Sequence, residues 1–148
     1  MQLEIGYNFP FEIRKEKLSY NGKDNFSILF LSDLHLNYFT KPKTNAIFQN
    51  IEELNPTIIL FGGDYVDSYQ GLIQLDSLLK KISQRQNLFA IAGNHDYYFG
   101  IEKIKATMEA NHVVWIEKQS FDLCINETTI RILGNSQKNE EKQSDVSI

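Results

Sequence analysis

The stretch Ile28-Leu29-Phe30-Leu31-Ser32-Asp33-Leu34-His35 is an apolar run followed at once by polar residues. The same pattern returns in 58–64, IILFGGD, and in 88–96, LFAIAGNHD. Short continuous apolar runs predict buried parallel strands, whose carboxyl ends meet at one edge of a sheet. In open α/β sheets that edge is where ligands bind. The three stretches therefore predict both a fold and the position of a site.

Helical periodicity separates these runs and predicts crossover helices on a parallel sheet. Apolar residues recur at helical spacing in 47–54, 72–82 and 101–108. A short strand over 113–116 and a hairpin over 121–133 should follow, because turn residues divide two alternating runs. Residues 11–18 alternate apolar and charged side chains, which predicts an early edge strand. The predicted class is α/β, a βαβ sheet with flanking helices.

Composition limits the possible functions of the chain. Its 148 residues, 42% hydrophobic and 23% charged, are typical of one globular domain with a core. The net charge of −4 and the absence of a basic block argue against a dedicated nucleic-acid surface. The single Cys124 excludes an internal disulfide and a cysteine-rich zinc site. No apolar run approaches the ~20 residues that span a bilayer, and 1–10 lacks the features of a signal peptide, so we expect a cytoplasmic location.

The polar residues behind the apolar runs suit a two-metal phosphoester hydrolase. Such sites hold two divalent ions about 3.5–4 Å apart, which clamp the phosphate oxygens. Asp33 and His35 lie two residues apart, and in extended geometry both side chains would reach one ion. Asp64 can bridge two ions, and Asn94 offers a carbonyl oxygen to the second. Mixed oxygen and imidazole ligands suit manganese, iron or zinc.

His95 is the candidate general acid, because an imidazole ordinarily titrates near neutral pH. We expect the carboxylate of Asp96 to hydrogen-bond the other ring nitrogen of His95 and to hold its tautomer. Asp67 should cap or hydrogen-bond the following loop rather than bind metal. The aromatic run 97–99 has two interpretations, a substrate pocket or packing at the rim of the core.

The segments 32–35, 62–64 and 93–96 resemble, in this order, the first three motifs of the calcineurin-like metallophosphoesterase family. The resemblance covers roughly 28–134, the N-terminal half of such a domain. It implies that His95 contacts substrate, with Asp96 in support, and that Asp64 bridges the ions. The implied metal ligands are Asp33, His35, Asp64 and Asn94.

Longer stretches are similar to membrane-associated bacterial members, some of which hydrolyse the pyrophosphate of UDP-2,3-diacylglucosamine. These stretches are LSDLHL at 31–36, GGDYVD at 62–67 and GNHDYYFG at 93–100. The subgroup implies a phosphoester or pyrophosphate substrate and peripheral membrane association.

The family pattern continues with three histidines that complete both metal shells, and this chain does not supply them. Its remaining histidine, His112, is expected in a solvent-facing turn. We therefore expect a partial domain over 1–134, with the second half of the sandwich absent, and a disordered polar tail over 135–148. A complete member would hold two ions, and this chain one or none. The predicted function is a metal-dependent phosphoester hydrolase by ancestry, weakly active or inactive alone, with uncovered sheet surface that favours self-association. The alternative is a non-catalytic scaffold or a remnant of the same fold.

Overall fold

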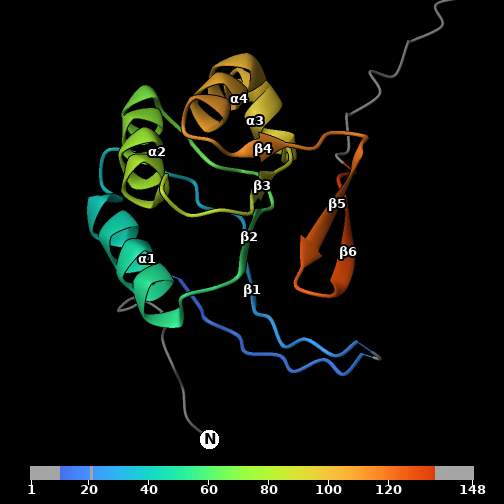
Figure 1. Cartoon of the computed structure of the whole chain (residues 1–148). Helices are drawn as coiled ribbons and strands as arrows, with labels where there is room; N and C mark the ends of the chain where they lie inside the picture. The colour runs from blue at the N-terminus through green and yellow to red at the C-terminus, as the bar shows by residue number, and fades with distance from the viewer. Residues whose placement is uncertain (1–10, 21, 136–148) are drawn as a thin grey trace, which may run out of the picture.

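Figure 1 shows the computed structural model of the chain, in which residues 11–20 and 22–135 are described. The strands and helices alternate along the first three quarters of the chain and end in a hairpin. In chain order they are β1 (Ile28–Leu31), α1 (Lys41–Leu54), β2 (Ile58–Phe61), α2 (Tyr69–Ile82), β3 (Leu88–Ala90), α3 (Asn94–Phe99), α4 (Ile101–Ala110), β4 (Val114–Trp115), β5 (Ser120–Ile125) and β6 (Thr128–Leu133). This order confirms the predicted α/β class.

The central sheet is parallel and has the spatial order β1-β2-β3-β4, the same as the chain order. Each strand therefore lies beside the one before it, as in the pairing of Ile28 with Ile58. Because crossovers between parallel strands are right-handed, this order places every crossover helix on one face of the sheet. Figure 1 shows α1 and α2 on that side, with the β5–β6 hairpin on the other.

The two faces of the sheet bury alternate residues of the same strands, as the pleat requires. On the helix side, Ile59 and Phe61 of β2 pack with Ile51 of α1 and Leu79 of α2. On the hairpin side, the residues in contact come from β2, β3, the position after β4, β5 and β6. They are Ile58, Phe89 and Ile116, with Leu123, Ile125, Ile130 and Ile132 of the hairpin.

The hairpin leaves the β1 edge of its face open. Ile28 is 49% exposed and Phe30 is 61% exposed, although both belong to a sheet strand. Leu133, at the end of β6, is 73% exposed. Apolar surface of this kind on a sheet marks an area that another layer of protein can cover.

Three expectations about the ends of the chain have different outcomes. The edge strand predicted over 11–18 is wrong, since the described residues 11–20 form no strand and are almost all exposed. Alternation alone does not make a strand when no sheet edge pairs with the segment. The tail predicted from 135 onward lies, apart from 135 itself, outside the described residues. None of the helices within residues 11–20 and 22–135 has the length and apolar content that crossing a bilayer requires.

Candidate metal centre

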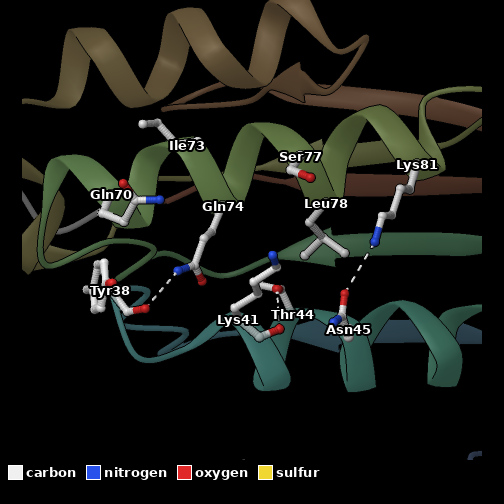
Figure 2. Close-up of a pocket in the computed structure, with 10 residues that line it drawn as sticks. All are labelled: Tyr38, Lys41, Thr44, Asn45, Gln70, Ile73, Gln74, Ser77, Leu78 and Lys81. Atoms are coloured by element: carbon white, nitrogen blue, oxygen red, sulfur yellow. Dashed lines mark hydrogen bonds between the residues drawn. The ribbon is translucent and has the colours of Figure 1, made fainter.

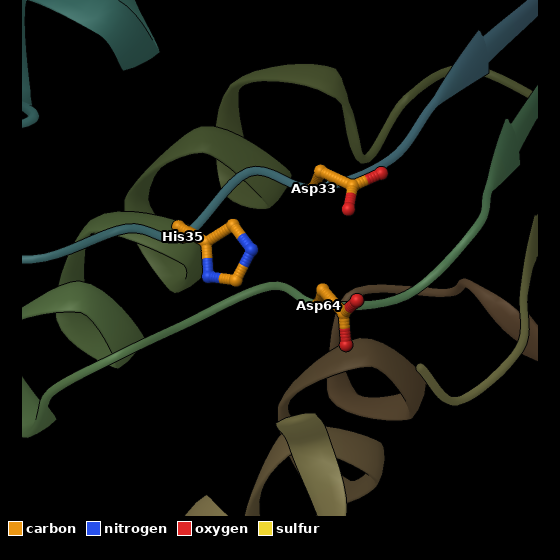
Figure 3. Close-up of side chains that lie close together, drawn as sticks. All are labelled: Asp33, His35 and Asp64. Atoms are coloured by element: carbon orange, nitrogen blue, oxygen red, sulfur yellow. The ribbon is translucent and has the colours of Figure 1, made fainter. Parts of the chain in front are cut away.

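Three side chains with metal-binding atoms converge just beyond the carboxyl ends of β1 and β2. Asp33, His35 and Asp64 each offer one ligand atom, and these atoms all lie within 4.8 Å of one another. Figure 3 shows the two carboxylates and the imidazole facing a common space. Carboxylate oxygen and imidazole nitrogen together suit manganese, iron or zinc, so the donor set fits a divalent cation.

Backbone hydrogen bonds bring the two loops together. The N–H of Asp33 donates to Gly63 O over 3.1 Å, and the N–H of His35 donates to Asp64 O over 3.0 Å. The parallel pairing of β1 with β2 thus continues past the strand ends. Leu34 and Leu36, between and after the ligands, are 3% and 0% exposed and anchor the first loop in the core.

The backbone at the three candidate ligands is left-handed, with φ of 54° at Asp33, 44° at His35 and 56° at Asp64. The side chains of Asp33 and His35 do meet, as expected. The reason given for it, an extended backbone, is wrong. Residues with a Cβ rarely adopt this conformation, and such strain gathers at functional sites because the surrounding structure enforces it.

The ring of His35 is oriented by the carboxylate of Asp67, which was expected to cap or hydrogen-bond the following loop. Its Nδ1 lies 2.8 Å from Asp67 Oδ1, a distance that fits an N–H donating to a carboxylate. Figure 3 shows the other ring nitrogen on the side that faces Asp33 and Asp64. Metal-binding histidines commonly use one nitrogen for the ion and the other for a carboxylate. Asp67 does not cap α2, because the side chain of Ser68 accepts the hydrogen bond from Gly71 N at that position.

The third predicted segment, 93–96, forms the start of α3 and lies beside the triad. Gly93 is the N-cap of α3, and the N–H of His95 in the first turn donates to Asp64 Oδ1 over 2.9 Å. The rings of His95 and His35 lie 5.2 Å apart between centroids. Asn94 is exposed on the same helical turn. Its role as a ligand, and that of His95 as an acid, stay predictions.

Two glycines allow the second and third loops to touch. A Cβ at Gly93 would lie 2.2 Å from Asp64 Oδ1, and a Cβ at Gly63 would lie 2.2 Å from Gly93 N. Gly63 also has a φ of 97°, which side chains disfavour. The sequence signal for this contact was a glycine directly before each polar residue, Gly63 before Asp64 and Gly93 before Asn94.

Asp96 has a different partner from the one predicted. Its side chain is fully buried, and its oxygens accept hydrogen bonds from the backbone N–H groups of Asp64, Tyr65 and Gly93 over 2.8–2.9 Å. The expectation that Asp96 holds the ring of His95 is therefore wrong. A carboxylate at the third position of a helix reaches back to the cap, and the pattern Gly-x-x-Asp was the signal for it. Burial raises the pKa of Asp96, and the three backbone donors oppose that effect.

Other hollows and histidines lie away from this centre. A groove of about 480 Å³ lies between α1 and α2 (Figure 2), and none of its lining residues belongs to the triad. Its polar side chains bond mainly to each other and to nearby backbone, as Gln74 Nε2 does to Asn37 O over 2.6 Å. His112 lies exposed in the turn after α4, as expected.

Comparison with known proteins agrees with this geometry. The profile of the family Calcineurin-like phosphoesterase matches residues 26–141. The Escherichia coli (strain K12) protein Phosphodiesterase YaeI is 32% identical over 136 residues, which cover 86% of this chain and 47% of that protein. Uncharacterized metallophosphoesterase YkuE of Bacillus subtilis (strain 168) is 35% identical over 101 residues, which cover 65% and 35% of the two chains.

A third relative is the Danio rerio protein Transmembrane protein with metallophosphoesterase domain. It is 33% identical over 112 residues, which cover 72% of this chain and 24% of that protein. The chain thus spans half or less of the length of these relatives. From the extent of the profile match and the identity to these relatives, the chain belongs to the calcineurin-like phosphoesterase family.

Proposed function

We propose that this chain carries the first half of the active site of a metal-dependent phosphoester hydrolase, of phosphodiesterase or pyrophosphatase type. The observation that carries the proposal is the meeting of Asp33, His35 and Asp64 within 4.8 Å. The two carboxylates attract a divalent cation, and the imidazole beside them adds a nitrogen ligand to the oxygen donors. The family supports the reaction class.

Each side chain would have a distinct task in this reaction. A bound divalent ion would polarise the phosphoryl group and stabilise charge in the transition state. Asp33, Asp64 and Nε2 of His35 would hold that ion, and Asp67 would fix the ring of His35. His95, beside the triad, would donate a proton to the leaving oxygen as the P–O bond breaks.

We infer that the chain by itself binds one ion. Asn94 would add an oxygen ligand to a second ion, and among the described residues the triad is the only cluster of three or more candidate ligands. The ion would be manganese, iron or zinc, as the donor set indicates. The pyrophosphatase subgroup, the cytoplasmic location and the peripheral membrane association inferred from sequence stay predictions.

The metal proposal is tested by titrating the chain with Mn²⁺ and following the free ion by electron paramagnetic resonance. We expect about one bound ion, and at least a tenfold loss of affinity in Asp64→Asn. The matched control is Asp122→Asn, the same change at a carboxylate that pairs with Arg131 on the hairpin. Equal manganese binding by wild type and Asp64→Asn would contradict the site.

Hydrolysis of bis-p-nitrophenyl phosphate with Mn²⁺ then separates enzyme from scaffold. Turnover that Asp64→Asn abolishes supports a hydrolase. Specific metal binding without turnover supports the alternative of a non-catalytic scaffold or remnant. The observation behind that alternative is the open apolar face at Ile28 and Phe30, which a layer of protein outside the described residues would have to cover.

The same face leads us to propose self-association of the isolated chain. Phe30→Ser removes the more exposed of the two large side chains, and we expect it to shift the chain toward monomer in size-exclusion chromatography with light scattering. Ser substitution at Tyr69, similarly exposed but on α2, is the control and should leave the mass unchanged. A monomeric wild type at tens of micromolar would contradict this proposal.

A further inference from the structure

The three aromatic residues of α3 have different environments. Tyr97 and Phe99 are partly buried against the core, and the hydroxyl of Tyr97 donates to Glu117 Oε1 over 2.6 Å. Tyr98 is 78% exposed, although it is a large side chain between two packed ones. Packing at the rim of the core, one of the two interpretations of this run, thus accounts for Tyr97 and Phe99 but not for Tyr98.

The ring of Tyr98 is next to that of His95, which in turn is next to the candidate centre. The ring of His95 is 5.2 Å from that of His35, and the ring of Tyr98 is 6.4 Å from that of His95, at an interplanar angle of 73°. His95 and Tyr98 are three residues apart on one helix, a spacing that brings side chains to the same face. The three rings are therefore consecutive neighbours, from His35 through His95 to the exposed Tyr98.

Helix α3, which carries His95 and Tyr98, is firmly held. Asp96 binds its first turn to the loop of Asp64, and Tyr97 ties its middle to Glu117. A ring on such a support is pre-organised, so little ordering is needed when a ligand stacks on it.

We propose that Tyr98 is a subsite for a planar aromatic group attached to the leaving oxygen of a phosphoester, a proposal that rests on the function proposed above. A phosphoryl group at the triad, with its leaving oxygen turned to His95, directs the remainder of the alcohol toward Tyr98. An exposed phenol ring offers a flat apolar face to an aryl group or a nucleobase. Tyr98 would thus select the alcohol and contact substrate without taking part in bond cleavage.

The test uses binding, so that it does not depend on turnover. Phenyl phosphate and methyl phosphate carry an aryl and an alkyl group on the leaving oxygen of a phosphate monoester substrate. Both are titrated into the manganese-loaded chain, and affinity is measured from the broadening of the ³¹P resonance. Stacking on one aromatic side chain should make phenyl phosphate bind about tenfold tighter than methyl phosphate. Tyr98→Ala should bring the two affinities together without changing that for methyl phosphate. Tyr98→Phe should keep the preference.

Tyr38→Ala is the matched control, because Tyr38 is 71% exposed but lines the groove between α1 and α2. It should keep the preference for phenyl phosphate. Equal binding of both esters by the wild type, or an equal loss of both in Tyr98→Ala, would overturn the subsite and leave the hydrolase proposal standing. Binding of neither ester, or binding that Asp64→Asn does not weaken, would overturn the proposed function and the subsite with it.

Discussion

Replacing Asp33 by glycine should stabilise the metal-free chain relative to replacing it by alanine. The φ of 54° at this position lies in the left-handed region. That conformation costs a residue with a Cβ about 1–2 kcal/mol. Glycine avoids this cost but loses about 0.5–1 kcal/mol of chain entropy on folding. Taking the middle of each range, the net advantage of glycine over alanine is about 0.75 kcal/mol.

Both variants lack the carboxylate, so their difference isolates the backbone from the repulsion between Asp33 and Asp64. For a chain of 148 residues, the advantage corresponds to a rise in Tm of about 1–4 °C. The assay is thermal unfolding of the two variants in EDTA, followed by circular dichroism. Both should also lose the stabilisation that Mn²⁺ gives the wild type, which is about 2.7 kcal/mol at a hundredfold excess over Kd.

Asp76, in the middle of α2, provides the control for this comparison. In a helix interior alanine is favoured over glycine by about 1 kcal/mol, so the order of the two variants should reverse at this position. An alanine variant at position 33 that equals or exceeds the glycine variant in Tm would show that the ligand loop is not left-handed. The account of a strained centre would then be wrong.

Three more predictions concern the support of the centre and the surface around it. Asp96→Ala should lower the free energy of unfolding by about 3–5 kcal/mol in urea titrations, because it leaves backbone N–H groups buried without an acceptor. Gly93→Ala should reduce Mn²⁺ affinity at least tenfold in the same titration as above, since its Cβ would collide with Asp64 Oδ1. The side-chain hydrogen bond from Lys80, and then that from Asn111, hold the pKa of Asp76 below the ordinary value for an aspartate. The stability this gives is therefore present above that value and lost as pH falls through the lower folded pKa, so urea midpoints of Asp76→Asn and wild type should differ at pH 7 and converge in acid.

The sequence predicted the large elements well because their signals are local. Apolar runs such as Ile58–Phe61 are too long and too apolar for an exposed loop, and parallel order follows from the helices between them. The convergence of Asp33, His35 and Asp64 then follows from the shared edge of the sheet. The segment 11–18 shows the limit of this reasoning, because a strand also needs a partner, and no local pattern states whether one is present.

The finer contacts of the site depended on information that is not local. The bond of Asp67 to His35 joins residues that are 32 positions apart, and nothing near Asp67 indicates which loop lies beside it. The carboxylate of Asp96 could bond either the ring of His95 or nearby backbone N–H groups. The fold places the backbone N–H groups within its reach, and it bonds those. The left-handed ligand loop was missed because ligand spacing was interpreted with strand geometry beyond the end of the strand.

The single carboxylate that gathers amides from two loops has a dynamic consequence. Because Asp96 accepts from Asp64, Tyr65 and Gly93 at once, none of these amides can reach solvent by a separate local opening. Deuterium exchange of their hydrogens should therefore report one common free energy of opening. The loops that hold Asp64 and Gly93 would then separate only together. A ligand would therefore meet a site that is either complete or fully open.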